Sequence, residues 1–150
     1  MAISIKKITK HIGAEIDCDV RLRELSESDF IDVKKAFEEH SVLVFRGQPL
    51  SDEDQISFSE RFGSLETTVN SNPEGGGTVM TVLSNVDQQN KVIPPEDKRM
   101  VFNTGNQMWH TDSSFKRVPA LMSLLSGREV PSIGGETQFA SMRAAYGSLA

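Results

Sequence analysis

Residues 41–50, with the sequence SVLVFRGQPL, decide the kind of fold to expect. Val42 to Phe45 form a short run of aliphatic and aromatic residues, which is typical of a buried strand. Gly47 and Pro49 follow this run and end it, because glycine and proline favour turns. The predicted strand lies between two segments with helical patterns, so helix and strand are both expected early in the chain.

Each neighbouring segment begins with a residue suited to cap a helix. Ser26, with Asp29 three positions on, starts an amphipathic pattern that predicts a helix over residues 27–39. Ser51 precedes an acidic first turn, which suits the positive end of a helix dipole and predicts a second helix. Gly63 is the expected C-terminal cap of that second helix.

Beyond residue 63 the pattern changes to short strands and long loops. Strands are predicted at residues 79–83, 109–115, 121–129 and 136–140, after an earlier one at residues 3–6. Polar segments with glycine or proline predict loops at residues 70–78 and 85–99. Ser141 is a candidate N-cap for a last helix over residues 142–146. Helices followed by successive short strands predict an α+β domain with a mainly antiparallel sheet.

The composition limits the classes of function. The chain has 150 residues, of which 37% are hydrophobic and 25% charged, as expected for one globular domain. Its formal net charge of -5 argues against binding to nucleic acid, since the phosphates would repel it. A single cysteine, Cys18, allows neither an internal disulfide nor a cysteine-cluster zinc site. Neither a signal peptide nor a membrane-spanning run is recognisable, so a cytoplasmic protein that binds no membrane is expected.

The residues with the clearest chemistry lie within the predicted strand at residues 109–115, WHTDSSF. Residues i and i+2 of a strand point to the same face, so His110 and Asp112 would present an imidazole nitrogen and a carboxylate oxygen side by side. Two such neighbours form one edge of a 2-His-1-carboxylate iron site. The bare His-x-Asp pattern also arises by chance, and a surface hydrogen-bonded pair is the other interpretation.

Several motifs together resemble the taurine / 2,4-dichlorophenoxyacetate dioxygenase family. They follow one another in the family's order and spacing: residues 41–50, SVLVFRGQPL; residues 61–66, RFGSLE; residues 109–115, WHTDSSF; residues 131–139, with GGET at 134–137; and residues 142–146, MRAAY. The resemblance implies a partial double-stranded β-helix, or jelly roll, with flanking N-terminal helices. It also implies an oxidoreductase that uses Fe(II), 2-oxoglutarate and dioxygen to hydroxylate a small organic acid, of the aryloxyalkanoate or sulfonate class, in catabolism.

The resemblance assigns roles to individual residues. His110 and Asp112 would ligate the iron, and no catalytic residue beyond these metal ligands is implied. Thr137 would contact the 2-oxoglutarate carboxylate through its hydroxyl. Without the family resemblance, Thr137 would be interpreted as an ordinary threonine of a strand. Asn106 would help to line the substrate and co-substrate pocket, with a loop asparagine that bonds to local backbone as the alternative. Cationic partners for an anionic substrate are sought among four residues near the predicted loops: Lys98, Arg99, Lys116 and Arg117.

Members of the family are much longer than this chain, and their second half supplies the distal iron histidine and an arginine for 2-oxoglutarate. Residues 1–150 are therefore expected to be the N-terminal part of a single dioxygenase domain, truncated at the C-terminus and inactive alone. The alternative is a catalytically inert homologue that acts as an assembly partner. A cupin-like domain with a different metal ranks last, because cupin sites use more histidines than this chain offers. A homo-oligomer and an assembly with a homologous subunit both stay open.

Overall fold

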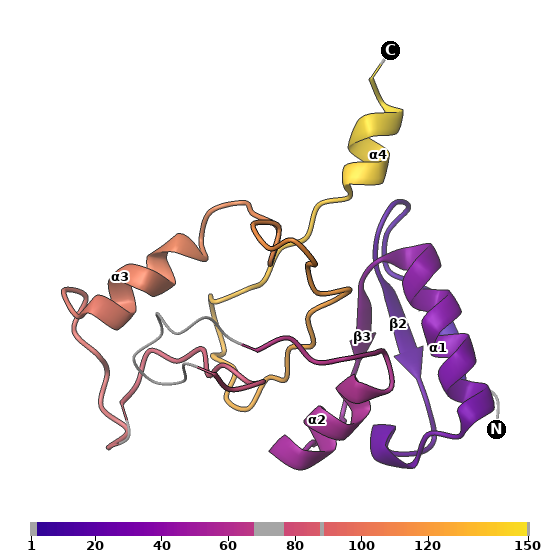
Figure 1. The fold of residues 1–150 in the computed structure, drawn as a ribbon, viewed down its shortest axis with the longest axis horizontal. Coiled ribbons are helices and arrows are strands. Elements are labelled where there is room, and N and C mark those ends of the chain that lie inside the picture. Colours follow the sequence, from indigo (N-terminus) through magenta and orange to yellow (C-terminus); the bar gives the residue numbers. More distant parts are fainter. Residues whose placement is uncertain (1–2, 68–76, 88, 150) are drawn as a thin grey trace. The chain divides into compact units, whose positions relative to one another are not determined.

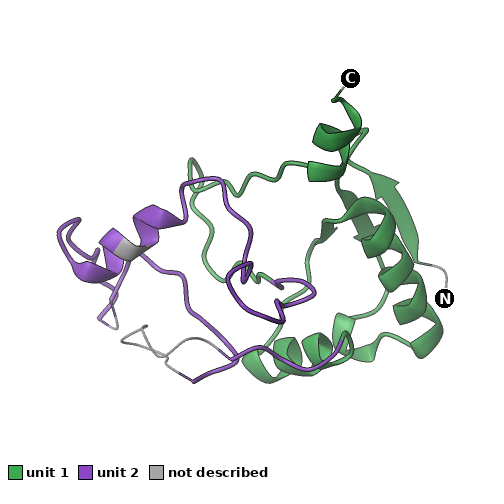
Figure 2. Cartoon of the chain, turned by 45° about the horizontal axis from the view of Figure 1, so that its top comes forward, with its two compact units in different colours: residues 1–62, 125–150 green, residues 63–124 purple. Residues whose placement is uncertain are grey.

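The computed structural model describes residues 3–67, 77–87 and 89–149. These residues form two compact units, one of residues 1–62 with 125–150 and one of residues 63–124 (Figure 2). We call them unit 1 and unit 2 and describe each by itself. Unit 1 contains the sheet and most of the helices, whereas the one helix described in unit 2 is α3, Lys98–Gly105.

The sheet of unit 1 has three strands in the order β1-β2-β3. Strand β1, Ser4–Lys7, pairs antiparallel with β2, Ala14–Asp17, and β2 pairs parallel with β3, Leu43–Phe45. The strands predicted at residues 3–6 and 42–45 are thus confirmed to within one residue, although β3 is half-buried rather than buried. The parallel pairing of β2 with β3 requires a crossover connection, which η1, Leu22–Glu24, and the first helix supply (Figure 1).

Helix α1, Glu27–His40, covers the sheet through a buried apolar face. Ser26 caps it by accepting a hydrogen bond from the backbone N–H of Asp29, as the sequence predicted. Phe30, Val33 and Ala36 follow at helical spacing and are all almost fully buried. This face packs against β2 and β3 (Figure 1), so the apolar residues of the amphipathic pattern form the surface through which the helix contacts the sheet.

Helix α2, Asp52–Glu60, begins with a reciprocal capping box between Ser51 and Asp54. Its start is confirmed, but the expectation that Gly63 caps its end was wrong, because Arg61 is the C-cap. Four aromatic rings from α1, β3 and α2 and its end pack edge to face, with centroids 4.7–6.3 Å apart: Phe30, Phe45, Phe58 and Phe62. We call these rings the phenylalanine cluster; Phe30 and Phe58 are buried in the apolar core of unit 1, and Phe45 and Phe62 are half-buried.

Two arginines attach residues 125–149 to the N-terminal part of unit 1. The guanidinium of Arg128 donates to the carbonyl of Leu50 and to the Asp52 carboxylate, the latter at 2.9 Å, beside the start of α2. Arg143 donates to the carbonyl of Glu38 at 2.8 Å. Arg143 lies in α4, Met142–Gly147, whose N-cap is Ser141, so the last predicted helix is confirmed.

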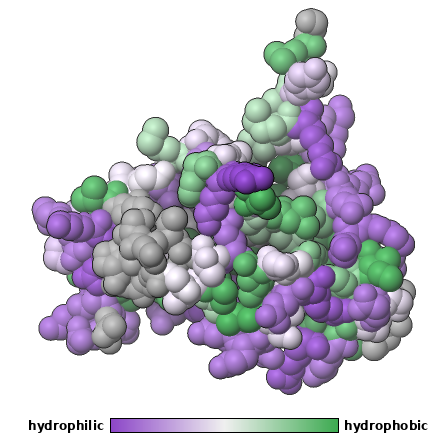
Figure 3. Space-filling model, viewed as in Figure 1, coloured by the Kyte–Doolittle hydropathy of each residue, from purple (hydrophilic) through white to green (hydrophobic). Residues whose placement is uncertain are grey.

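The four strands predicted after residue 63 do not form in the described structure. Residues 79–83, 109–115, 121–129 and 136–140 belong to no ladder, and the only described pairing beyond β3 is a single antiparallel bridge between Val86 and Val92. A strand needs a neighbour that exchanges backbone hydrogen bonds, and no described segment lies alongside these residues to do so. Many of their apolar side chains are exposed, among them Val82, Trp109 and Phe115. Figure 3 shows hydrophobic residues, in green, at several places on the surface that it presents.

The loop predicted at residues 85–99 was partly wrong, because α3 begins inside it. Asp97 caps α3 by accepting a hydrogen bond from the backbone N–H of Arg99. The sequence did not predict this helix start, because the proline residues earlier in the segment are more typical of a loop. The loop predicted at residues 70–78 lies mostly outside the described residues. None of the helices in the described part of the chain is long and apolar enough to cross a membrane.

Candidate metal centre

His110 and Asp112 lie close together in unit 2, in the segment that follows α3. The Nε2 atom of His110 is 3.3 Å from the Oδ1 atom of Asp112. The sequence predicted that these two donors would be neighbours, and they are, although His110 and Thr111 lie in an irregular segment that leads into a turn at residues 112–115 rather than in the predicted strand. Both side chains are solvent-accessible, with 47% and 60% of their surfaces exposed, so a small ion can reach them.

The orientation of the His110 ring is set by a hydrogen bond on its other nitrogen. Nδ1 lies 2.7 Å from the carbonyl oxygen of Met108, and a carbonyl oxygen can only accept. Nδ1 therefore carries a proton, and in the neutral ring the lone pair is on Nε2, which faces Asp112. A histidine that donates one ring N–H to a backbone carbonyl and offers the other nitrogen is the usual form of a metal-bound histidine.

The Asp112 carboxylate is oriented in the same manner, by an outer hydrogen bond, that is, one from a residue that is not itself a candidate metal ligand. Ser123 Oγ donates to Asp112 Oδ2 at 2.6 Å, which leaves Oδ1 directed at His110. In the neutral-histidine form, Nε2 and Oδ1 are then two acceptors in contact, and two lone pairs at 3.3 Å repel unless a cation lies near both. A metal ion satisfies both atoms at once, so this pair of donors fits two protein ligands of an iron site.

A third protein ligand is not found beside this pair in the described part of the chain. No group of three or more histidine, cysteine, aspartate or glutamate side chains that could hold a metal ion occurs among residues 3–67, 77–87 and 89–149. His110 and Asp112 alone would hold a metal weakly, because two ligands leave most of its coordination positions to water.

The two residues predicted to bind 2-oxoglutarate are differently placed. Asn106 is in unit 2 at the C-terminal end of α3, where its backbone N–H bonds to the carbonyl of Asn103 and its side chain is exposed. Among the described residues no hydrogen bond joins Asn106 to His110 or Asp112. Thr137 is exposed in unit 1, so its contact with a co-substrate beside the metal ligands stays a prediction.

Three contributors to the site were missed by the sequence analysis. The carbonyl of Met108 and the hydroxyl of Ser123 orient the two candidate ligands, and Glu66 contacts the turn after Asp112. A backbone carbonyl and a serine carry no pattern that distinguishes them in a sequence. Two of the cations considered for an anionic substrate are already paired within the chain, Lys116 with Glu66 and Arg99 with Asp97.

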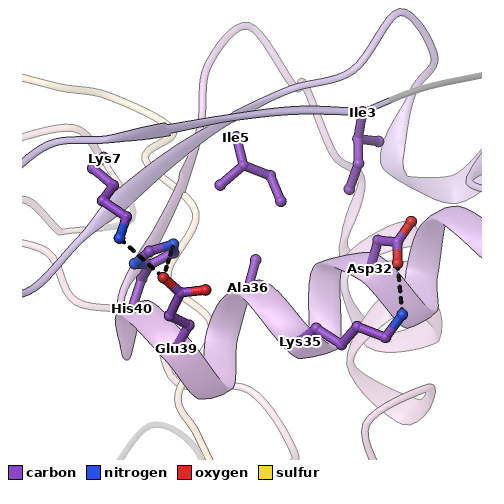
Figure 4. Close-up of a pocket in the computed structure, with 8 residues that line it drawn as sticks. All are labelled: Ile3, Ile5, Lys7, Asp32, Lys35, Ala36, Glu39 and His40. Atoms are coloured by element: carbon purple, nitrogen blue, oxygen red, sulfur yellow. Dashed lines mark hydrogen bonds and ion pairs between the residues drawn. The ribbon is translucent and has the colours of Figure 1, made fainter.

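A surface hollow in unit 1 contains none of the predicted site residues. It lies between β1 and α1, with Ile5 and Ala36 among its lining, and Figure 4 shows Lys7 reaching Glu39 across it. The Lys7–Glu39 ion pair is 3.0 Å long, and His40 lies beside Glu39 at 3.7 Å and is buried. The charged groups here are occupied by one another, which indicates a structural contact between strand and helix rather than a ligand site.

Replacing Ser123 by alanine is expected to weaken metal binding about 10- to 100-fold, the usual cost of losing an outer hydrogen bond to a ligand. The Asp112 carboxylate would lose the bond that directs Oδ1 toward His110. Anaerobic titration with Mn(II) measures the affinity, and Ser123→Thr, which keeps a hydroxyl, should retain most of it. Equal affinity in wild type and Ser123→Ala would show that the 2.6 Å bond does not orient the ligand.

Known proteins with similar sequences include alpha-ketoglutarate-dependent dioxygenases. The chain is 43% identical, over 136 residues, to the alpha-ketoglutarate-dependent 2,4-dichlorophenoxyacetate dioxygenase of Cupriavidus pinatubonensis, covering 87% of this chain and 47% of that protein. It is 37% identical to the (S)-phenoxypropionate/alpha-ketoglutarate-dioxygenase of Sphingobium herbicidovorans, covering 99% of this chain and 48% of that protein. The chain thus spans about half the length of the curated relatives it matches.

Solved structures and a family model agree with these similarities. AAD-2, crystallised with Mn(II) and N-oxalylglycine, is 35% identical and superposes with a TM-score of 0.86, covering 100% of this chain and 50% of AAD-2. A protein from Burkholderia xenovorans described as a putative alpha-ketoglutarate dependent 2,4-D dioxygenase gives 27% identity and a TM-score of 0.69, covering 99% of this chain and 47% of that protein. The model of the taurine catabolism dioxygenase TauD, TfdA family matches residues 4–150. The chain therefore belongs to the TauD, TfdA family of taurine catabolism dioxygenases.

Proposed function

We propose that this chain is the N-terminal part of an Fe(II)- and 2-oxoglutarate-dependent dioxygenase that hydroxylates a small organic acid. The observation that carries the proposal is the His110–Asp112 pair, whose Nε2 and Oδ1 atoms face each other at 3.3 Å while outer hydrogen bonds hold both side chains. Membership of the TauD, TfdA family supports it. An aryloxyalkanoate substrate is favoured over a sulfonate by the names of the relatives, which act on phenoxy acids.

The proposal assigns one role to each candidate site residue. His110 Nε2 and Asp112 Oδ1 hold the iron, and the third protein ligand lies outside the described residues. The hydroxyl of Thr137 binds a carboxylate of 2-oxoglutarate, and Asn106 lines the pocket. When bound, Fe(II) with 2-oxoglutarate activates dioxygen for the oxidation of a C–H bond. The chain's own contribution is to orient the two ligands through the hydrogen bonds with the Met108 carbonyl and the Ser123 hydroxyl.

The proposed complete fold is a double-stranded β-helix in which residues 79–149 gain strand partners. The superposition on AAD-2, with a TM-score of 0.86 over this whole chain, supports that arrangement. The apolar side chains exposed in this segment support it as well, since Trp109, Phe115 and Ile133 are 70%, 75% and 91% exposed. Large apolar side chains in such numbers are buried in most complete folds.

The proposal is tested with the natural gene product under Fe(II), ascorbate and 2-oxoglutarate. We expect oxygen uptake and succinate formation with 2,4-dichlorophenoxyacetate or (S)-2-phenoxypropionate, together with release of the corresponding phenol. Taurine is the comparison substrate for the sulfonate class. Asp112→Ala provides the inactive control. Absence of 2-oxoglutarate consumption with every acid, in a protein shown to be folded, would refute the proposed reaction.

None of the comparisons supports the alternative of an inert homologue that serves as an assembly partner. The relatives that the chain matches are described as dioxygenases, and both metal-ligand positions are occupied by residues able to bind iron. We therefore do not propose this second function.

A further inference from the structure

Three side chains form a polar cluster next to the candidate metal ligands. Glu66 Oε1 accepts hydrogen bonds from Lys116 Nζ at 2.7 Å and from Ser113 Oγ at 2.9 Å. Lys116 Nζ also donates to the carbonyl of Thr67 at 3.1 Å. We call Glu66, Ser113 and Lys116 the glutamate anchor. It joins a segment just after α2 to the turn that directly follows Asp112, although 47 residues separate Glu66 from Ser113.

The Glu66–Lys116 pair differs from the other ion pairs among the described residues. It is the shortest of them, and its side chains are only 30% and 23% exposed, similar to the 34% and 29% of the Arg99–Asp97 pair and well below the 70% and 53% of the Lys35–Asp32 pair. A partly buried pair is screened less by salt and solvent than an exposed one. The pKa of Glu66 is lowered, chiefly by the hydrogen bond from Lys116 and less by that from Ser113, so the carboxylate is charged at neutral pH.

The backbone at Ser113 explains why an anchor is needed there. Ser113 has a φ of 56°, in the left-handed region that residues with a Cβ rarely adopt. The turn continues with a hydrogen bond from the Lys116 N–H to the Ser113 carbonyl. Strained residues of this kind persist where the surroundings hold them, and here Glu66 bonds to the side chains at both ends of the turn.

We propose that Glu66 and Lys116 are positioning residues that hold the turn after Asp112 and thereby fix the carboxylate of Asp112 toward the metal. The inference rests on the proposed function, because it assumes that Asp112 is a ligand. Neither Glu66 nor Lys116 touches the metal in this arrangement. They act through Ser113, the residue after Asp112, whose hydroxyl donates to Glu66, while Ser123 donates to the carboxylate of Asp112 itself.

The test measures Mn(II) affinity in the natural gene product by anaerobic titration, with Glu66→Gln, Lys116→Met and the double variant. Glu66→Gln keeps the size of the side chain and removes its charge. We expect each single substitution to weaken Mn(II) binding about 10- to 100-fold, as for other outer partners of metal ligands. The double variant should be no weaker than either single variant, because both remove the same contact. Lys116→Arg should restore most of the affinity.

Controls separate a positioning role from a general loss of stability. Asp32→Asn breaks the exposed Lys35–Asp32 pair and should leave Mn(II) affinity unchanged. Ser113→Gly removes the hydroxyl at a position where glycine adopts positive φ readily, and it should also weaken binding. Folded Glu66→Gln and Lys116→Met proteins that bind Mn(II) as tightly as wild type would overturn this inference alone. A wild-type protein that binds no Mn(II) would overturn the proposed function and this inference with it.

Discussion

Replacing Asp112 or His110 by alanine is expected to lower metal affinity by more than about 100-fold, which exceeds the usual effect of an outer hydrogen-bond partner. Each substitution removes one of the two donor atoms that lie 3.3 Å apart. The remaining side chain would then bind the metal as a single ligand. Anaerobic titration with Fe(II) or Mn(II), with and without 2-oxoglutarate, measures the change.

His11→Ala is the matched control for His110→Ala. His11 is also exposed, but among the residues that the structure describes it forms no ion pair with a carboxylate as His110 does with Asp112, so its loss should leave metal affinity unchanged. Asp112→Asn is a second control. It keeps the shape of the side chain and an oxygen that can accept a hydrogen bond from Ser123, but it removes the negative charge. Wild-type affinity in either alanine variant would mean that the metal binds elsewhere.

Phe30→Ala should produce the largest loss of stability in unit 1, about 3–5 kcal/mol in the free energy of unfolding. The Phe30 ring is 3% exposed and packs edge to face on Phe62 and Phe58, with centroids at 4.7 and 6.1 Å. The guanidinium of Arg61 lies 4.0 Å from the ring centroid, so the substitution also removes a cation–π contact. The cavity would lie at the centre of the phenylalanine cluster, where helix and sheet meet.

Urea denaturation of Phe30→Ala and of Ile31→Ala provides the measurement and its control. Ile31 is the next residue of the same helix, but it is 46% exposed, so its truncation should change stability by about 0.5 kcal/mol or less. Both substitutions raise helix propensity by a similar amount, because alanine is the best helix former and isoleucine and phenylalanine rank close together, so the difference between the two variants reports the packing. Similar losses in the two variants would show that the phenylalanine cluster does not dominate the stability of unit 1.

The helices with conventional caps and the early strands could be predicted because their signals are local. Ser26, Ser51 and Ser141 cap helices where the sequence placed them, since a capping serine needs only the backbone of the next three residues. Strand β3 followed from a short apolar run bounded by turn residues. The closeness of His110 and Asp112 was also predictable, because side chains two positions apart can make contact in a strand and in an irregular segment alike.

Other elements were not recognisable in the sequence. Strand β2 has only Ala14 and Ile16 on its buried face, and it is a strand because β1 and β3 pair with its two edges. Helix α3 begins soon after Pro94 and Pro95, which are more typical of a loop. Four apolar segments with strand character remain unpaired in the described structure, because propensity alone cannot supply a neighbouring strand.

The amino-acid sequence by itself determined the three serine-capped helices, strands β1 and β3, the family and the two candidate iron ligands, all of which depend on residues near one another or on motif order. Only the tertiary structure decided how those ligands are oriented. The bond from Ser123 to Asp112 and the anchor from Glu66 to Ser113 join residues 11 and 47 positions apart. Such contacts leave no periodic pattern in a sequence, because they depend on where the folded chain returns and not on the local backbone.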